Sequence, residues 1–234
     1  KIKELTNYDP ANPLKGGVAF PTGVNINECA AHYSPNPEDT EQVLGPNDII
    51  KIDFGVHING YITDGAFSFS FNNRFDQLIK ISEEATAVGM KLAGVDAYIG
   101  DIGKEIQETI ECNEIELDGK IWDVKSIKDL CGHQIGQYRI HCGKPVPNIF
   151  LPILHKNEYY RMKEGEVYAI ETFPTTGDGS VVENLPQCSH YMANYHNPSV
   201  FTAKSISQSE FTKSMDKRFS TLCFCKRFMN DYGL

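Results

Sequence analysis

The sequence predicts an α+β domain, and two features of its 234 residues carry that prediction. Two strand-like runs, Ile49–His57 and Tyr61–Phe71, are joined by Asn59-Gly60, a pair typical of two-residue hairpin turns. The segment Gln77–Leu92 instead repeats apolar residues every three or four positions, as one face of a helix requires. Strands mixed with long helices favour one α+β domain, with or without an elaboration, around one sizeable core.

Ahead of this hairpin, the sequence predicts one more strand and then a loop. Gly17–Asn27 has the pattern of a short strand and turn. In the following loop, Ala30–Pro37, the prolines Pro35 and Pro37 exclude a helix, because a proline disfavours helical geometry in the residue before it. The loop carries His32, the first of several histidines in unusual settings.

Beyond the first helix, the sequence predicts a second helix and a second hairpin. Asp101 is predicted as the N-cap of the second helix, because its side chain can accept a hydrogen bond from the first turn. The buried stripe of this helix is predicted to comprise Ile102, Ile106 and Ile110. The strand-like segment Glu114–Val124 then contains Asp118-Gly119, which predicts a hairpin turn.

The C-terminal part predicts one further strand and a helical segment. Val167–Phe173 is predicted as a strand that follows a turn at Gly165. From Ala193 onward the chain is polar and predicted to be helical. The apolar face of that segment is predicted to comprise Phe211, Met215, Phe219 and Leu222.

Composition and charge exclude several classes of protein. A formal net charge of -9 argues against a direct nucleic-acid site, because phosphate binding requires a surplus of clustered lysine and arginine. No apolar stretch approaches the length of a membrane span. The seven cysteines are odd in number and lack zinc-knuckle spacing, which predicts reduced thiols and a cytoplasmic protein. They are Cys29, Cys112, Cys131, Cys142, Cys188, Cys223 and Cys225.

Two aspartates interrupt the apolar strands of the first hairpin. With a two-residue turn, Gly55 faces Asp64 and Asp53 faces Ala66, which places both acids on one face as diagonal neighbours. A four-residue loop would also keep them on one face, whereas a three-residue loop would separate them. Two buried carboxylates repel, so they must share a proton or bind a cation. The alternative is that one caps a turn and the other pairs with a lysine or arginine.

Two more residues extend this candidate cluster. Glu171 is an acid inside the apolar strand YAIETF, and His133 lies in CGHQIG with glycines close on both sides, where a metal or substrate can approach closely. A glycine-flanked histidine on its own is more often structural than a ligand. The combination of Asp53, Asp64, His133 and Glu171 favours two hydrolytic metal ions over a structural zinc site.

Three further histidines, His32, His141 and His190, are candidates for proton transfer and for stabilising an oxyanion. Each of them taken singly has the default interpretation of a core or surface histidine. Only their number and settings, AAHY, RIHC and SHYM, suggest a shared role.

Six motifs give the sequence a family resemblance. They are GVAFPTG (17–23), AAHYSPN (30–36), KIDFGVH (51–57), GHQIGQYRIH (132–141), GEVYAIETF (165–173) and SHYM (189–192). Together and in this order, the sequence resembles the type 2 methionine aminopeptidases, a branch of the pita-bread (creatinase/aminopeptidase-like) metallopeptidases. The resemblance implies a pita-bread catalytic domain over residues 1–192 and a type 2 helical insertion over residues 193–234.

The resemblance also implies roles for individual residues. Asp53 would bind one divalent ion, Asp64 would bridge two, and His133 and Glu171 would hold the other; the ions would be cobalt, manganese, iron or zinc. His32 resembles the histidine that fumagillin-type epoxides alkylate. His141 and His190 would contact the scissile peptide. Glu171 would transfer a proton during its hydrolysis. The implied methionine pocket comprises Phe20, Ile140, Phe173 and Met192.

Three departures from the family pattern accompany the resemblance. The family has a fifth ligand, a glutamate beyond the insertion, and a pocket tyrosine, and neither has a counterpart in this chain. Cys131 stands where the family usually has asparagine. We therefore expect the chain to be part of a longer protein, whose N-terminal extension and last strands are not included in this sequence.

The expected substrate is the N-terminal methionine of peptides and nascent chains, cleaved by a monomeric protein. The resemblance further implies ribosome association through the N-terminal extension. Two alternatives have the same fold: a prolidase or aminopeptidase P, and a metal-free binding protein like the proliferation-associated relatives, which bind RNA or ribosomes. Activity on X-Pro peptides and metal analysis separate these alternatives from the aminopeptidase.

Overall fold

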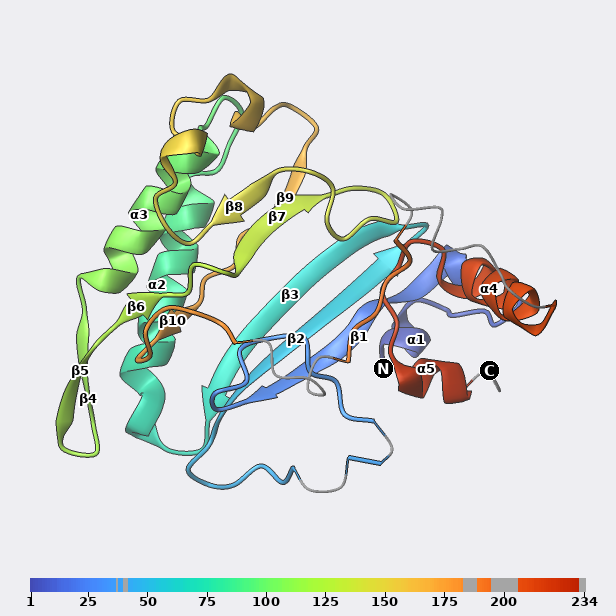
Figure 1. Cartoon of the computed structure of the whole chain (residues 1–234), viewed down its shortest axis with the longest axis horizontal. Helices are drawn as coiled ribbons and strands as arrows, with labels where there is room; N and C mark the ends of the chain where they lie inside the picture. The colour runs from blue at the N-terminus through green and yellow to red at the C-terminus, as the bar shows by residue number, and fades with distance from the viewer. Residues whose placement is uncertain (37, 40–41, 183–188, 195–205, 232–234) are drawn as a thin grey trace.

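The structure, a computed structural model, describes residues 1–36, 38–39, 42–182, 189–194 and 206–231 (Figure 1). The helices are α1 (Ile2–Leu5), α2 (Asp76–Leu92), α3 (Ile99–Glu111), α4 (Ile206–Phe219) and α5 (Lys226–Asp231). The strands are β1 (Gly16–Ile26), β2 (Ile49–Ile58), β3 (Tyr61–Ser70), β4 (Glu114–Leu117), β5 (Lys120–Asp123), β6 (Lys125–Ser126), β7 (Cys131–Ile135), β8 (Pro145–Pro147), β9 (Val167–Ala169) and β10 (Pro174–Thr175). Short 3-10 turns lie at Pro13–Lys15, Asn73–Phe75, Pro152–Leu154 and Glu158–Tyr160.

A long antiparallel sheet of order β1-β2-β3 occupies the middle of the molecule, between α2 and α3 on one side and the C-terminal helices on the other (Figure 1). Its hairpin has the predicted two-residue turn, because Asn59 and Gly60 both take positive φ, at 49° and 80°. The register pairs Gly55 with Asp64 and Asp53 with Ala66. The predicted placement of both acids on one face is therefore confirmed.

Strand β1 confirms the predicted strand and contains two irregularities. Its register against β2 shifts on either side of Phe20, which pairs with Gly55. A Cβ atom on Gly55 would lie 2.2 Å from Cε1 of the Phe20 ring, so only glycine leaves room for this ring. The bulges thus direct a buried phenylalanine across β2 beside the acidic hairpin.

Helices α2 and α3 pack together and form the main apolar core with β8 and neighbouring loops. The predicted buried stripe of α3 is confirmed, since Ile102, Ile106 and Ile110 are buried. The predicted N-cap is wrong: Tyr98 precedes the helix, and Asp101 lies within its first turn. Its carboxylate Oδ1 is 2.8 Å from His155 Nδ1, so Asp101 holds a neighbouring loop instead of capping the helix.

The second hairpin, β4-β5, confirms the predicted turn at Asp118-Gly119. The predicted strand over Val167–Phe173 is too long, since β9 ends at Ala169. Beyond that point, the amide of Phe173 donates to Asn148 Oδ1 at 3.2 Å, and its carbonyl accepts from the Ile127 amide at 2.9 Å. The backbone N–H and C=O of Phe173 are hydrogen-bonded to a side chain and a loop, so the strand pairing of β9 does not continue to this residue.

The C-terminal segment is helical as predicted, in α4 and α5. Met215, Phe219 and Leu222 are buried, but Leu222 lies after the end of α4. Phe211 is 45% exposed, so its assignment to the apolar face is wrong. Pro37, Cys188 and two stretches of the predicted insertion, 195–205 and 232–234, lie outside the described residues. Within the described chain, no helix has both the length and the apolar character to cross a membrane.

Candidate metal centre

One open cleft of about 1610 Å³ lies against the central sheet. All the residues that the sequence analysis selected line this cleft: Phe20, His32, Asp53, Asp64, His133, Ile140, His141, Glu171, Phe173, His190 and Met192. They come from β1, β2, β3, β7 and four connecting segments, so the fold brings together residues that are far apart in the sequence.

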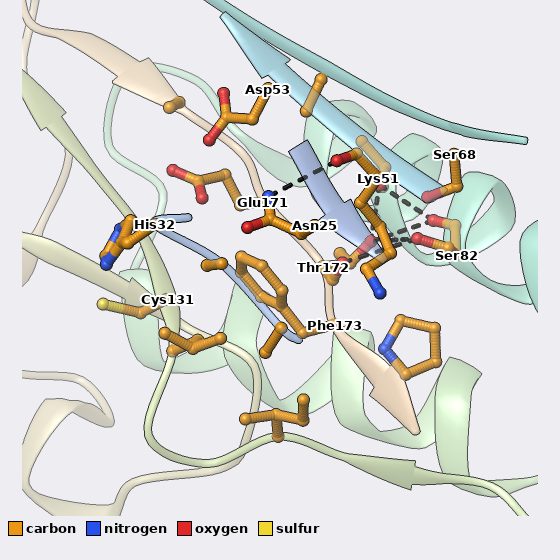
Figure 2. A pocket seen from close by; sticks show the side chains of 18 of the residues that line it. Asn25, His32, Lys51, Asp53, Ser68, Ser82, Cys131, Glu171, Thr172 and Phe173 are labelled. Carbon is orange, nitrogen blue, oxygen red and sulfur yellow. Dashed lines mark hydrogen bonds between the residues drawn. The ribbon is translucent and has the colours of Figure 1, made fainter. Parts of the chain in front are cut away.

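Asp53 on β2 and Asp64 on β3 enter the cleft from the same face of the hairpin. Burial, together with the negative charges of Asp64 and Glu171, raises the pKa of Asp53 to about 7. Its buried Oδ1 atom has no hydrogen-bond partner among the described residues. Figure 2 shows the carboxylates of Asp53 and Glu171 near each other in the pocket, with His32 also facing it.

His133 and Glu171 approach the hairpin from the small sheet β8-β7-β9. His133 pairs with Ala169, and Glu171 follows two residues after that pair. A Cβ atom on Gly132 would lie 2.4 Å from the Ala169 carbonyl oxygen, which explains the glycine beside this histidine. Nε2 of His133 lies 2.9 Å from Glu171 Oε1 and 3.5 Å from Asp64 Oδ2.

Asp64, His133 and Glu171 therefore form a group whose ligand atoms all lie within 4.8 Å of one another. Asp53 does not belong to this group but lies close enough for its charge to interact with Asp64 and Glu171. Burial opposes protonation of His133, but the two carboxylates outweigh it and raise its pKa to about 9. A divalent cation fits this donor set, because it would neutralise the carboxylates and engage the unpartnered Oδ1 of Asp53.

The three further histidines also lie beside this group. The ring of His141 is 4.3 Å from that of His133, and the ring of His190 is 5.6 Å from that of His32, measured between centroids. Desolvation within the cleft and neighbouring imidazoles lower the pKa of all three, even though His32 and His141 keep an exposed face. All three rings are therefore uncharged at neutral pH.

The hydrogen bonds of His190 and His141 differ. Nε2 of His190 donates to the Pro21 carbonyl at 2.8 Å, so this nitrogen is engaged by the protein. Nothing in the described part of the chain forms a hydrogen bond with the His141 ring. His141 thus has a free donor in the cleft, whereas the described contacts of His190 fix its orientation.

The implied methionine pocket is uneven. Phe20 and Ile140 are buried and belong to a second apolar cluster with Leu222. Met192 is 47% exposed, and Phe173 is half-buried, so the pocket has one firm wall and one open side. Cys131 also lines the cleft, and burial and the nearby Glu171 charge raise its pKa.

Two residues with defined contacts in this region were not selected from the sequence. Asn25 is 1% exposed; its Oδ1 accepts from the Tyr33 amide at 3.0 Å and its Nδ2 donates to the Lys51 carbonyl. Ser189 is 3% exposed and contacts the loop of His32. An asparagine in a strand and a serine before a histidine carry no signal that would have identified them.

Comparison with known proteins agrees with this geometry. Residues 4–193 match metallopeptidase family M24. The chain belongs to that family. The M24 chain is 45% identical over 231 residues to methionine aminopeptidase 2 of Komagataella phaffii, covering 98% of this chain and 50% of that protein. It is 46% identical to methionine aminopeptidase 2A of Arabidopsis thaliana over 225 residues, 95% of this chain and 48% of that protein. It thus spans about half the length of these relatives.

Solved structures confirm the fold of this M24 chain. Methionine aminopeptidase of Thermotoga maritima superimposes with a TM-score of 0.59 at 25% identity, over 71% of this chain and 61% of that one. A thermophilic Arx1 superimposes with a TM-score of 0.65 at 19% identity, over 91% of this chain and 62% of that one, which bears on the fold alone. The pita-bread fold and the family expected from the six motifs are confirmed.

Proposed function

We propose that the protein is a metal-dependent aminopeptidase that removes the N-terminal methionine of peptides and nascent chains. The observation that carries the proposal is the convergence of Asp64, His133 and Glu171, with Asp53 beside them, in a cleft of an M24 chain. The relatives named methionine aminopeptidase 2 support the substrate. Because these relatives are named for methionine removal, they favour this activity over the cleavage of X-Pro peptides.

Two divalent ions are the proposed cofactors. Asp64, His133 and Glu171 would hold one ion, and Asp53 with Asp64 would hold the other. When bound, such ions lower the pKa of water and polarise a carbonyl group, which supplies the hydrolytic chemistry. The carboxylate-rich donor set with one imidazole suits manganese, cobalt, iron or zinc.

The remaining side chains have proposed roles in binding the peptide. Glu171 would accept and return a proton, because its carboxylate lines the cleft and its Oε1 lies 2.9 Å from His133 Nε2. His141, whose ring nitrogens have no hydrogen-bond partner among the described residues, would donate to the developing oxyanion. His190 would orient the peptide from its fixed position beside Pro21. His32 would contact the substrate from a position beside His190, whose ring lies 5.6 Å away.

Specificity for methionine is proposed to come from apolar packing. Phe20 and Ile140 supply a buried wall, and Phe173 and Met192 lie at the edge of the same cleft. An unbranched thioether suits such an apolar surface. We also infer a division into a catalytic part, residues 1–192, and a helical insertion, residues 193–234. A monomeric, cytoplasmic protein with ribosome association through an N-terminal extension completes the proposal and rests on the family resemblance.

The test uses the full-length protein with manganese and the peptide Met-Ala-Ser. We expect Asp64→Ala to lose activity by several orders of magnitude, because it removes a carboxylate from the proposed ion site. Asp123→Ala, which changes an exposed acid outside the cleft, serves as the matched control and should retain activity. Metal analysis should give about two ions per wild-type molecule. Normal cleavage by Asp64→Ala, or faster cleavage of X-Pro peptides than of Met-Ala-Ser by the wild type, would falsify the proposal.

A further inference from the structure

The loop that carries His32 has an unusual backbone. His32 has a φ of 64°, in the left-handed region that residues other than glycine rarely adopt. Such a conformation persists only where the surrounding structure holds it. The contacts of the loop therefore determine where the His32 ring lies in the cleft.

Ser189 makes several of those contacts. Its amide donates to the His32 carbonyl at 3.1 Å. Its hydroxyl accepts from the Ser34 amide at 2.7 Å and donates to the Ser34 carbonyl at 2.8 Å. Both serines are buried, with 3% and 0% exposure, so water cannot replace these hydrogen bonds. One side chain thus fixes the peptide groups on either side of Ser34.

Arg227 of α5 holds the next part of the same loop. Its Nη2 donates to Ser34 Oγ at 2.9 Å, and its Nη1 donates to the Pro35 carbonyl. The segment that leads into α5 is itself fixed, because Phe224 and Tyr191 exchange two backbone hydrogen bonds of 2.8 Å. The helix is therefore attached both to the loop of His32 and to the residue after His190.

These contacts join two histidines of the cleft. Ser189 directly precedes His190, whose ring lies 5.6 Å from that of His32. The charge of Arg227 also acts on His190, where it adds to the effect of burial in lowering the pKa. A change in Ser189 or Arg227 would therefore move both rings relative to each other.

We propose that Ser189 and Arg227 are positioning residues: they hold His32 in its left-handed conformation and set its geometry against His190. The inference deepens the proposed function, because it assigns the helical segment around α5 a part in peptide cleavage. Neither side chain needs to touch the substrate. Their effect reaches the reaction through the placement of the two imidazole rings.

The experiment compares two variants of the full-length, zinc-loaded protein with two matched controls; zinc is used because it is diamagnetic and leaves the histidine resonances sharp. Ser189→Ala removes the hydroxyl, and Arg227→Gln removes the guanidinium. Ser126→Ala is the control for the first, because Ser126 is 3% exposed and its hydroxyl has no hydrogen-bond partner among the described residues. Lys226→Gln is the control for the second, because the one side-chain contact of Lys226 among the described residues is an exposed ion pair with Glu38.

Two quantities are measured: kcat and KM on Met-Ala-Ser, and the NMR resonances of the Cε1–H groups of His32 and His190. We expect kcat to fall roughly 10- to 100-fold in both variants, with a smaller change in KM, because misplacement of about 1 Å has effects of that size. Both resonances should shift in the variants and stay unchanged in the controls. If Ser189→Ala does not fold, Arg227→Gln alone carries both measurements.

The proposal is overturned if both variants match their controls in kcat and in the two resonances. It is also overturned if they lose only thermal stability while kcat and the resonances stay at the wild-type values. Absence of any cleavage by the wild type would refute the proposed function instead. The NMR shifts would then decide the positioning role by themselves.

Discussion

Removing divalent ions should make the stability of the protein fall as the pH rises. Burial and the charges of Asp64 and Glu171 raise the pKa of Asp53 from 3.8 to about 7. Burial lowers the pKa of His133, but the carboxylates of Asp64 and Glu171 outweigh burial and raise this pKa from 6.5 to about 9. In both cases the folded state binds protons at a pH where the unfolded state has released them. The free energy of unfolding therefore decreases as pH rises, between about pH 4 and 7 for Asp53 and about pH 6.5 and 9 for His133.

The magnitude follows from these values. Between about pH 6 and about pH 9, linkage predicts a loss of about 1.4 kcal/mol from Asp53 and about 2.8 kcal/mol from His133. The expected fall in the free energy of unfolding is therefore about 4 kcal/mol. Asp53→Asn should reduce that fall by the contribution of Asp53, about 1.4 kcal/mol.

Urea unfolding in a chelating buffer at several pH values measures this fall directly. Parallel samples with excess manganese should show stabilisation that grows with pH, because the ion binds the deprotonated ligands. A chelated protein whose free energy of unfolding stays constant or rises from about pH 6 to about pH 9 would contradict the reasoning. Stabilisation by manganese that is equal at both pH values would contradict it as well.

Three other perturbations have defined outcomes. Ile106→Ala should lower the free energy of unfolding by about 2–5 kcal/mol in urea titrations, because Ile106 is fully buried in the α2–α3 core; a loss below about 1 kcal/mol would contradict this packing. Gly55→Ala should cost about 1–3 kcal/mol, since the new Cβ would meet the buried Phe20 ring, and an unchanged urea midpoint would count against that contact. Iodoacetamide at neutral pH should label exposed Cys112 before Cys131, whose pKa is raised by burial; mass spectrometry of the labelled peptides gives the order, and the reverse order would be inconsistent with it.

Local patterns were sufficient to predict the hairpin and its register. Asn59 and Gly60 both tolerate positive φ, so the turn length followed, and turn length fixes which side chains share a face. The extent of β9 was not predictable in the same way. Its apolar run continues to Phe173, but the ladder ends where Asn148 supplies a side-chain acceptor from a distant loop. Asp101 failed as an N-cap because a partner from another loop, His155, engages it.

The candidate site was visible in the sequence only in part. Asp53, Asp64 and Glu171 stood out because acids are rare inside apolar strands. Their convergence with His133 depends on how two separate sheets face each other, and no pattern in the sequence encodes that. Arg227 gave no signal, because an arginine on a polar helix is ordinary until the fold places it beside Pro35.

The bonds of Ser34 also bear on the order in which the molecule assembles. They join Ser34 to Ser189 and to Arg227, which follow 155 and 193 residues later in the chain. Closing such long loops costs more entropy than forming a hairpin, so contacts of this kind form late in folding. During synthesis from the N-terminus, the hairpin of Asp53 and Asp64 can fold well before the part of the cleft that carries His32 and His190 is complete. Catalytic competence would then arrive only after the segment that bears α5 has emerged.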